Sequence, residues 1–330
     1  MLGFYLMPAP SPTPIDDPYY NGAHRHFLRQ RSRGDWALNA KKRLFGNLLN
    51  PDFQAGNLPQ APIISQLPMG RHCYRGLSGA AMKKIISSLP HLRVFKYQCL
   101  AGVDRNDLIA RDTASKTIFE TLIYMPRVRR VAFWEGISGS MNSSAREYKS
   151  VNPILLLVAV KASYRLEHFS ICHAIDATDF FQSHHLLAGL RDPYTMRPYG
   201  WPHLAFLALT THIGRLRSNP VEVNRLILAA GNAASLMPKL QIMEVFTPGI
   251  REGFFFRYEV RDDGITRLFI AATWRLQILT EAVRPWRQVA ERHAPSRFVC
   301  QVESIRNPEA LTSHWSICSK LRLYRMMREQ

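Results

Sequence analysis

Histidine and aspartate residues gather between positions 176 and 185, where their side chains could bind a metal ion. His184 and His185 closely follow Asp176 and Asp179, so the group could offer two nitrogens and two carboxylates. Adjacent residues in a helix or strand point in different directions, and a His-His pair is therefore poorly placed to chelate one ion. We predict no metal site here.

Cys172 and His173 raise the question of nucleophilic catalysis, because a thiolate beside an imidazole can attack a substrate. Neighbouring residues of a strand face opposite sides of a sheet, however, which keeps such a pair apart. The chain also has no Gly-x-Ser-x-Gly nucleophile elbow, no Gly-x-x-x-x-Gly-Lys phosphate loop and no His-Glu-x-x-His helix. We predict a non-enzymatic protein with no catalytic residues, no metal and no cofactor.

Positive charge is the strongest feature of the composition. The chain has 43 Lys and Arg residues against 25 Asp and Glu residues, which gives a formal net charge of +18. Such an excess can indicate a nucleic-acid or other polyanionic partner. One cluster stands out between His24 and Arg43, and polyanion binding by this N-terminal arm is an alternative function. The arm would act through Arg25, Arg29, Arg31, Arg33, Lys41, Lys42 and Arg43.

Length and hydrophobicity restrict the class of protein further. With 330 residues, 46% of them hydrophobic, the chain can bury a large core. No apolar run approaches the roughly 18–20 residues of a membrane span, and the N-terminus lacks the basic leader of a signal peptide. The five scattered cysteines form no CxxC pair and predict buried free thiols. We expect a cytoplasmic or nuclear protein, a monomer, without membrane contact.

A short pattern recurs along the chain: an apolar residue and a proline, followed by alternating apolar residues. Four copies contain Pro90, Pro126, Pro202 and Pro238, and a fifth has Tyr164 in the place of proline. The spacings of these positions are 36, 38, 38 and 36 residues. A fixed period of this size is the signature of a repeat architecture.

The physical chemistry of one unit follows from its sequence. Residues before each proline have helical spacing, as in the apolar face of 221–237. Proline ends the helix and turns the chain into a strand, in which apolar side chains alternate. Repeated strand–helix units imply parallel strands with crossover helices. We predict an α/β solenoid of about five units over residues 35–249, preceded by a flexible, basic and Pro-rich leader, residues 1–34.

The last 80 residues depart from this rhythm and predict a C-terminal α+β cap, residues 250–330. Two strands, 254–260 and 265–274, flank the turn Asp262-Asp263-Gly264, and a helix over 280–292 and a strand over 298–305 follow. We expect this cap to close the exposed edge of the array. Earlier in the chain, we expect a helix that begins near Ala114, with Asp112 or Thr113 as its N-terminal capping residue.

Several motifs in order resemble a fungal family of leucine-rich-repeat-like, F-box-associated proteins, identified as domain of unknown function 6546. The resemblance covers Trp36 to Leu323 and implies an irregular leucine-rich-repeat-like fold. It implies no site residues. Nothing before residue 65 matches the Leu-Pro-x-Glu helix start of an F-box, so the family's link to ubiquitin ligases implies at most a substrate-recognition part whose F-box is missing. The motifs are Trp36-Ala37-Leu38, 89–97, 165–170, 175–181, Trp201-Pro202-His203-Leu204, 233–238, Phe256-Arg257-Tyr258 and Thr273-Trp274.

Strand residues that point away from the helices form the candidate binding face. If the apolar alternates face the core, the residues between them lie on the concave surface of the sheet. Aromatic and basic side chains in this row have the composition of a protein-binding hot spot, unless the leader or the cap covers them. We predict that an unknown protein partner binds here, through Lys96, Arg130, Trp134, His168, Phe206, Glu244 and Phe246.

Overall fold

A computed structural model gives the fold of the chain from residue 48 to residue 323, with interruptions. The described residues are 48–49, 51, 56, 58–70, 76–100, 105–136, 153–188, 200–212, 217, 219–247, 249, 251–293, 297–312 and 316–323. The predicted leader and the N-terminal basic arm lie outside them. No helix within these ranges has both the length and the apolar character that crossing a membrane requires.

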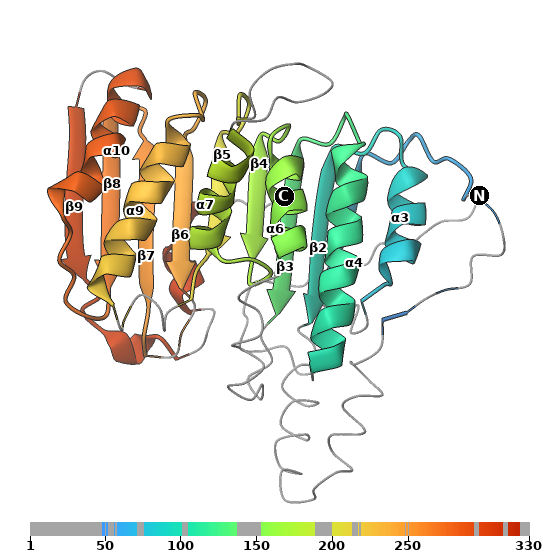
Figure 1. Cartoon of the computed structure of the whole chain (residues 1–330), viewed down its shortest axis with the longest axis horizontal. Helices are drawn as coiled ribbons and strands as arrows, with labels where there is room; N and C mark the ends of the chain where they lie inside the picture. Colours follow the sequence, from blue (N-terminus) through green and yellow to red (C-terminus); the bar gives the residue numbers. More distant parts are fainter. Residues whose placement is uncertain are drawn as a thin grey trace, which may run out of the picture.

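One sheet of nine strands runs through the described residues, and its strands lie side by side in the order of the sequence (Figure 1). The first six are parallel, as the repeat predicts. The strands are β1 (Gln66–Met69), β2 (Val94–Leu100), β3 (Arg130–Gly136), β4 (His168–Cys172), β5 (Phe206–Thr210), β6 (Ile242–Thr247), β7 (Phe254–Val260), β8 (Ile265–Ala272) and β9 (Arg297–Ser304).

Helices alternate with the strands and cover one face of the sheet (Figure 1). The opposite face carries none of the helices named below, and we call it the helix-free face. The helices are α3 (Gly79–Ser87), α4 (Arg105–Ile123), α6 (Pro153–Ser163), α7 (Ala177–Ala188), α9 (Pro220–Ala234) and α10 (Thr280–His293). Mixed α/β structure with alternating strands and helices is confirmed.

The same backbone contact recurs at the start of each inner parallel strand. The carbonyl oxygen of Arg93 accepts from the amides of Arg129 and Arg130, at 2.9 and 3.1 Å. The carbonyls of Arg129, Glu167 and Ala205 accept in the same way from the next strand. These residues follow the period of the prolines, and the register places Val94, Arg130, His168, Phe206 and Ile242 in one row. The repeat seen in the sequence is therefore a repeat of strand pairing.

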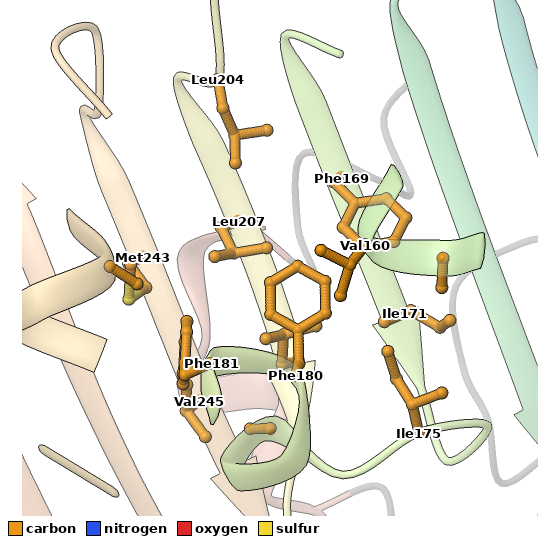
Figure 2. Packing of buried hydrophobic residues seen from close by; sticks show 14 of the residues in the cluster. Val160, Phe169, Ile171, Ile175, Phe180, Phe181, Leu204, Leu207, Met243 and Val245 are labelled. Atoms are coloured by element: carbon orange, nitrogen blue, oxygen red, sulfur yellow. The ribbon is translucent and has the colours of Figure 1, made fainter. Parts of the chain in front are cut away.

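The main core lies between the sheet and the helices (Figure 2). Phe169 and Ile171 of β4 and Leu207 of β5 point from the sheet toward Val160 of α6 and Phe180 of α7. The predicted alternation is confirmed, because Phe95, Val131, Phe169, Leu207 and Met243 are all buried on this side.

Local capping explains where some helices begin, and one start differs from the prediction. Asn219 caps α9 by accepting from the amide of Val221 at 3.0 Å, and Pro220 is the first helical residue. Helix α4 begins at Arg105 rather than near Ala114, so Asp112 and Thr113 lie inside it. The Thr113 hydroxyl donates to the carbonyl of Ile109 at 2.8 Å, which lets threonine sit within a helix rather than at its cap.

The residues after 250 form the predicted hairpin, helix and strand, but they continue the sheet instead of closing it. β7 and β8 are antiparallel around a turn in which Gly264 has a φ of 77°. β9 returns parallel to β8 and pairs with no other strand among the described residues. The prediction also missed β1, whose four residues add a short strand at the opposite edge.

Candidate functional site

The seven residues predicted for the binding face all lie on the helix-free face, but the structure divides them into two groups. Lys96, Arg130, His168 and Phe206 are half-buried, whereas Trp134, Glu244 and Phe246 are buried. The second group was expected to be exposed unless the leader or the cap covered it. It is covered, because residues 305–312 and 316–323 of the predicted cap fold back over these positions.

We call this returning chain the C-terminal segment, described at 305–312 and 316–323. It packs a second apolar cluster against the helix-free face. Trp134, Phe246 and Phe255 on the strands meet Ile317 and Leu321 of the segment. Further along, Leu323 packs with Ala208, Ile242 and Phe206. The covered part of the face is therefore core rather than binding surface.

The Glu244 side chain fastens the C-terminal segment to the sheet. Its carboxylate accepts from the Arg257 guanidinium at 2.6 Å, and from the backbone amides of Arg322 and Leu323 at 2.9 and 3.0 Å. Arg257 also donates to the carbonyl of Lys320, and Arg322 pairs with Glu259 at 3.3 Å. These bonds offset the several kcal/mol that burying an uncompensated carboxylate costs.

The uncovered residues line a small pocket at the start of β2–β5. Lys96, Arg130 and His168 come from three neighbouring strands, and Phe206 from a fourth. The imidazole of His168 lies on the Phe206 ring, with centroids 4.2 Å apart. Leu323 of the C-terminal segment supplies an apolar wall, so the Glu244 contacts indirectly shape the pocket. The remaining lining residues are Val94, Val131, Ala132, Phe169 and Ser170.

A second hollow adjoins this pocket and shares Val94 and Arg130 with it. Its other lining residues are Arg93, Arg127, Arg129 and Glu167. Arg129 lies 3.8 Å from Glu167, the one acidic side chain among the described residues that line either hollow. Together the two hollows form a continuous basic surface. The sequence analysis missed Arg93, Arg127 and Arg129, although their positions just before the predicted strands could have indicated them.

Burial and, to a smaller extent, the positive charge of Arg130 lower the pKa values of two side chains in the pocket. Burial lowers the pKa of His168 to about 4, and the nearby Arg130 guanidinium contributes in the same direction. Burial, followed by Arg130, also lowers the pKa of Lys96. His168 is therefore neutral at physiological pH. An anion in the pocket would oppose both effects, because it favours the protonated forms.

The other candidate groups of the sequence serve the fold. Burial raises the pKa of the Cys172 thiol to about 12, so it stays protonated. The buried Asp176 carboxylate accepts from the amides of Thr178 and His212 at 2.8 and 2.9 Å, which caps α7 and ties it to the end of β5. Within the described ranges no three His, Cys, Asp or Glu residues converge as metal ligands would. Cys99 and Cys318 are buried free thiols, whereas Cys300 is exposed.

The fold and this surface define the class: a single-sheet α/β protein with a basic pocket on the face that its helices leave open. The chain belongs to the family of unknown function DUF6546, whose model matches residues 117–327. The matched stretch begins within α4 and contains β3–β9. No curated protein and no solved structure matches the chain. The family resemblance is thereby confirmed, and its leucine-rich-repeat and F-box associations stay predictions.

Replacing the Glu244 carboxylate should release the C-terminal segment. In Glu244→Gln the charge-assisted bonds to Arg257 and to two amides are weakened, at a cost of about 1.5–3 kcal/mol. Amide hydrogen exchange over residues 316–323 should become roughly ten- to a hundredfold faster. The matched control Glu167→Gln, whose side chain is half exposed, should leave this exchange unchanged. Equal exchange in all three proteins would contradict the role given to Glu244.

The protonation of His168 provides a test of the pocket's electrostatics. We expect an NMR titration of the full chain to show this imidazole neutral down to a pKa of about 4. Arg130→Gln should raise the pKa of His168 but leave it below 6.5, because burial is the larger cause. Lys161→Gln on the helical side should not change it.

The pKa of His168 also makes stability depend on pH. The unfolded chain takes up this proton at higher pH, so the contribution of His168 to stability is complete above pH 6.5 and is lost as the pH falls toward 4. An imidazole that titrates near 6.5 in the folded chain would contradict the described pocket.

Proposed function

We propose that this chain is a non-enzymatic protein-interaction module that holds an acidic segment of a partner protein in the basic pocket of its helix-free face. The supporting observation is the convergence of Lys96, Arg130 and His168 from neighbouring strands on one hollow. We further propose that the parallel strands and their helices form an irregular leucine-rich-repeat-like arc. Proteins of that architecture use the open face of the sheet for recognition.

Charge complementarity supports an acidic partner. Lys96 and Arg130 are half-buried beside one another, and Arg130 adds to the burial that lowers the pKa of Lys96. A carboxylate between them would gain from both cations and would raise the pKa of His168, adding a third donor at lower pH. Around the pocket, the exposed Arg93, Arg127 and Arg129 would attract the same partner from a distance and speed its association.

The apolar walls favour a peptide as the occupant. Phe206 and Leu323 line one side of the pocket, and Val94 lines the other hollow as well. Adjacent strands are about 4.8 Å apart, so a pocket across β2–β4 accommodates one or two side chains of an extended segment. A partner segment with an acidic residue followed by an apolar one would place a carboxylate beside the cations and an apolar side chain against Phe206 and Leu323. The phosphate backbone of a nucleic acid would use the arginines but leave Phe206 and Leu323 without an apolar contact.

Binding of a defined probe tests this function. The probe is a fluorescein-labelled dodecapeptide of glutamates with one central phenylalanine, titrated against the full chain by fluorescence anisotropy. Arg130→Glu should weaken binding at least tenfold, because it removes a cation of the pocket and adds a repulsive charge. Lys161→Glu, an equal change of charge at an exposed position on α6, should weaken it less than threefold.

Two further measurements make the result decisive. Near-UV circular dichroism establishes that Arg130→Glu is folded, and Arg129→Glu at the exposed rim should give a smaller loss with a stronger dependence on salt. A single-stranded 20-mer DNA is titrated in parallel. Equal loss of peptide binding in Arg130→Glu and Lys161→Glu would contradict the proposed pocket. DNA binding that exceeds peptide binding, and that depends on residues 1–45, would favour the N-terminal arm as a polyanion site instead.

A further inference from the structure

β9 lies at the edge of the sheet, and its outer side has features that favour pairing with a further strand. Its eight residues bond to β8 on one side, and no strand of the described part lies along the other side. Natural edge strands are commonly blocked by proline, by lysine or by a very short length. β9 contains neither proline nor lysine, its charged residues Arg297 and Glu303 lie toward its two ends, and Val302, the sixth of its eight residues, is 44% exposed. By contrast, β1 at the opposite edge is only four residues long and contains Pro68.

The backbone of β9 determines which of its groups point outward. The amide of Ile305 donates to the carbonyl of Ala272 on β8, at 2.8 Å. Because backbone groups of successive strand residues point to alternate sides, those of Phe298, Cys300 and Val302 point away from β8. A second strand laid along this edge would find these donors and acceptors evenly spaced over the length of β9.

The sequence of β9 is complementary to itself when it is read in the opposite direction. In an antiparallel pair centred on Cys300, Arg297 of one copy lies opposite Glu303 of the other, and Phe298 lies opposite Val302. Arg297 and Glu303 fall on the same face of the sheet, so the pairing forms one cross-strand ion pair at each end. Of the antiparallel registers centred on residues 298 to 302, only this one opposes the two charges.

In place of the monomer expected from the sequence, we propose that two copies of this chain form a symmetric dimer by antiparallel pairing of their β9 strands, centred on Cys300. The twofold axis runs perpendicular to the sheet, so the two sheets join into one, and both helix-free faces look the same way. This interaction is distinct from the proposed partner binding, because the basic pocket lies at β2–β5, toward the other end of the sheet (Figure 1).

Light scattering coupled to gel filtration of the full chain tests the dimer. The chain of 37.8 kDa should elute with twice that mass at micromolar concentration. Arg297→Glu and Glu303→Arg should each raise the dissociation constant at least tenfold, because like charges then face each other. The double variant Arg297→Glu with Glu303→Arg should restore the dimer. Glu120→Arg on α4 carries the same change of charge as Glu303→Arg, far from β9, and should leave the mass unchanged.

Cross-linking through Cys300 gives an independent measurement. Opposed residues of a hydrogen-bonded antiparallel pair have Cα atoms about 5.5 Å apart, within reach of a short bismaleimide. The wild-type chain should yield a covalent dimer, and Cys300→Ser should yield none. A monomer at all concentrations would overturn the proposal. So would a dimer that persists unchanged in both single charge variants.

Discussion

The buried carboxylate of Glu244 is the contact on which the binding face depends. It lies in the middle of the sheet, where an unpaired charge would cost several kcal/mol. Arg257 on the next strand and two amides of the returning chain satisfy it. The carboxylate therefore fixes where the C-terminal segment crosses the sheet. Because Leu323 then forms a wall of the basic pocket, the position of one buried charge determines both what is covered and what stays open.

The parallel half of the fold could be predicted because its information is local. Each unit carries its own helix, its own stop at proline and its own alternation of apolar residues, and the spacing of Pro90, Pro126, Pro202 and Pro238 reveals the period even where Tyr164 interrupts it. The hairpin between β7 and β8 was equally readable, since its Asp-Gly turn requires the positive φ that Gly264 adopts. In these elements local preference and tertiary structure agree.

The features that the sequence did not predict depend on contacts between residues far apart in the chain. Nothing near Trp134, Glu244 or Phe246 singles out residues 305–312 and 316–323 as their cover, because the contacts are distant in sequence; the amides that bond Glu244 are 78 and 79 residues away. Helix α4 begins earlier than expected because Asp112 and Thr113, which favour caps, are accommodated within the helix. Only some of the basic residues around the two hollows were predicted. Lys96 and Arg130 followed from strand alternation, whereas Arg93, Arg127 and Arg129 lie just before the strands, where alternation does not apply.

The helix-free face is divided into a part that the C-terminal segment covers and a part that stays open. Hydroxyl-radical footprinting of the free, full-length chain tests this division most directly. Tyr124, which is 70% exposed, supplies the reference rate for an accessible ring. The structure predicts that His168 and Phe206 are oxidised, whereas Trp134 and Phe246 remain unmodified although tryptophan is intrinsically more reactive than either. Oxidation of Trp134 and Phe246 at rates comparable to Tyr124 would show that the C-terminal segment does not cover the sheet, and would contradict the account.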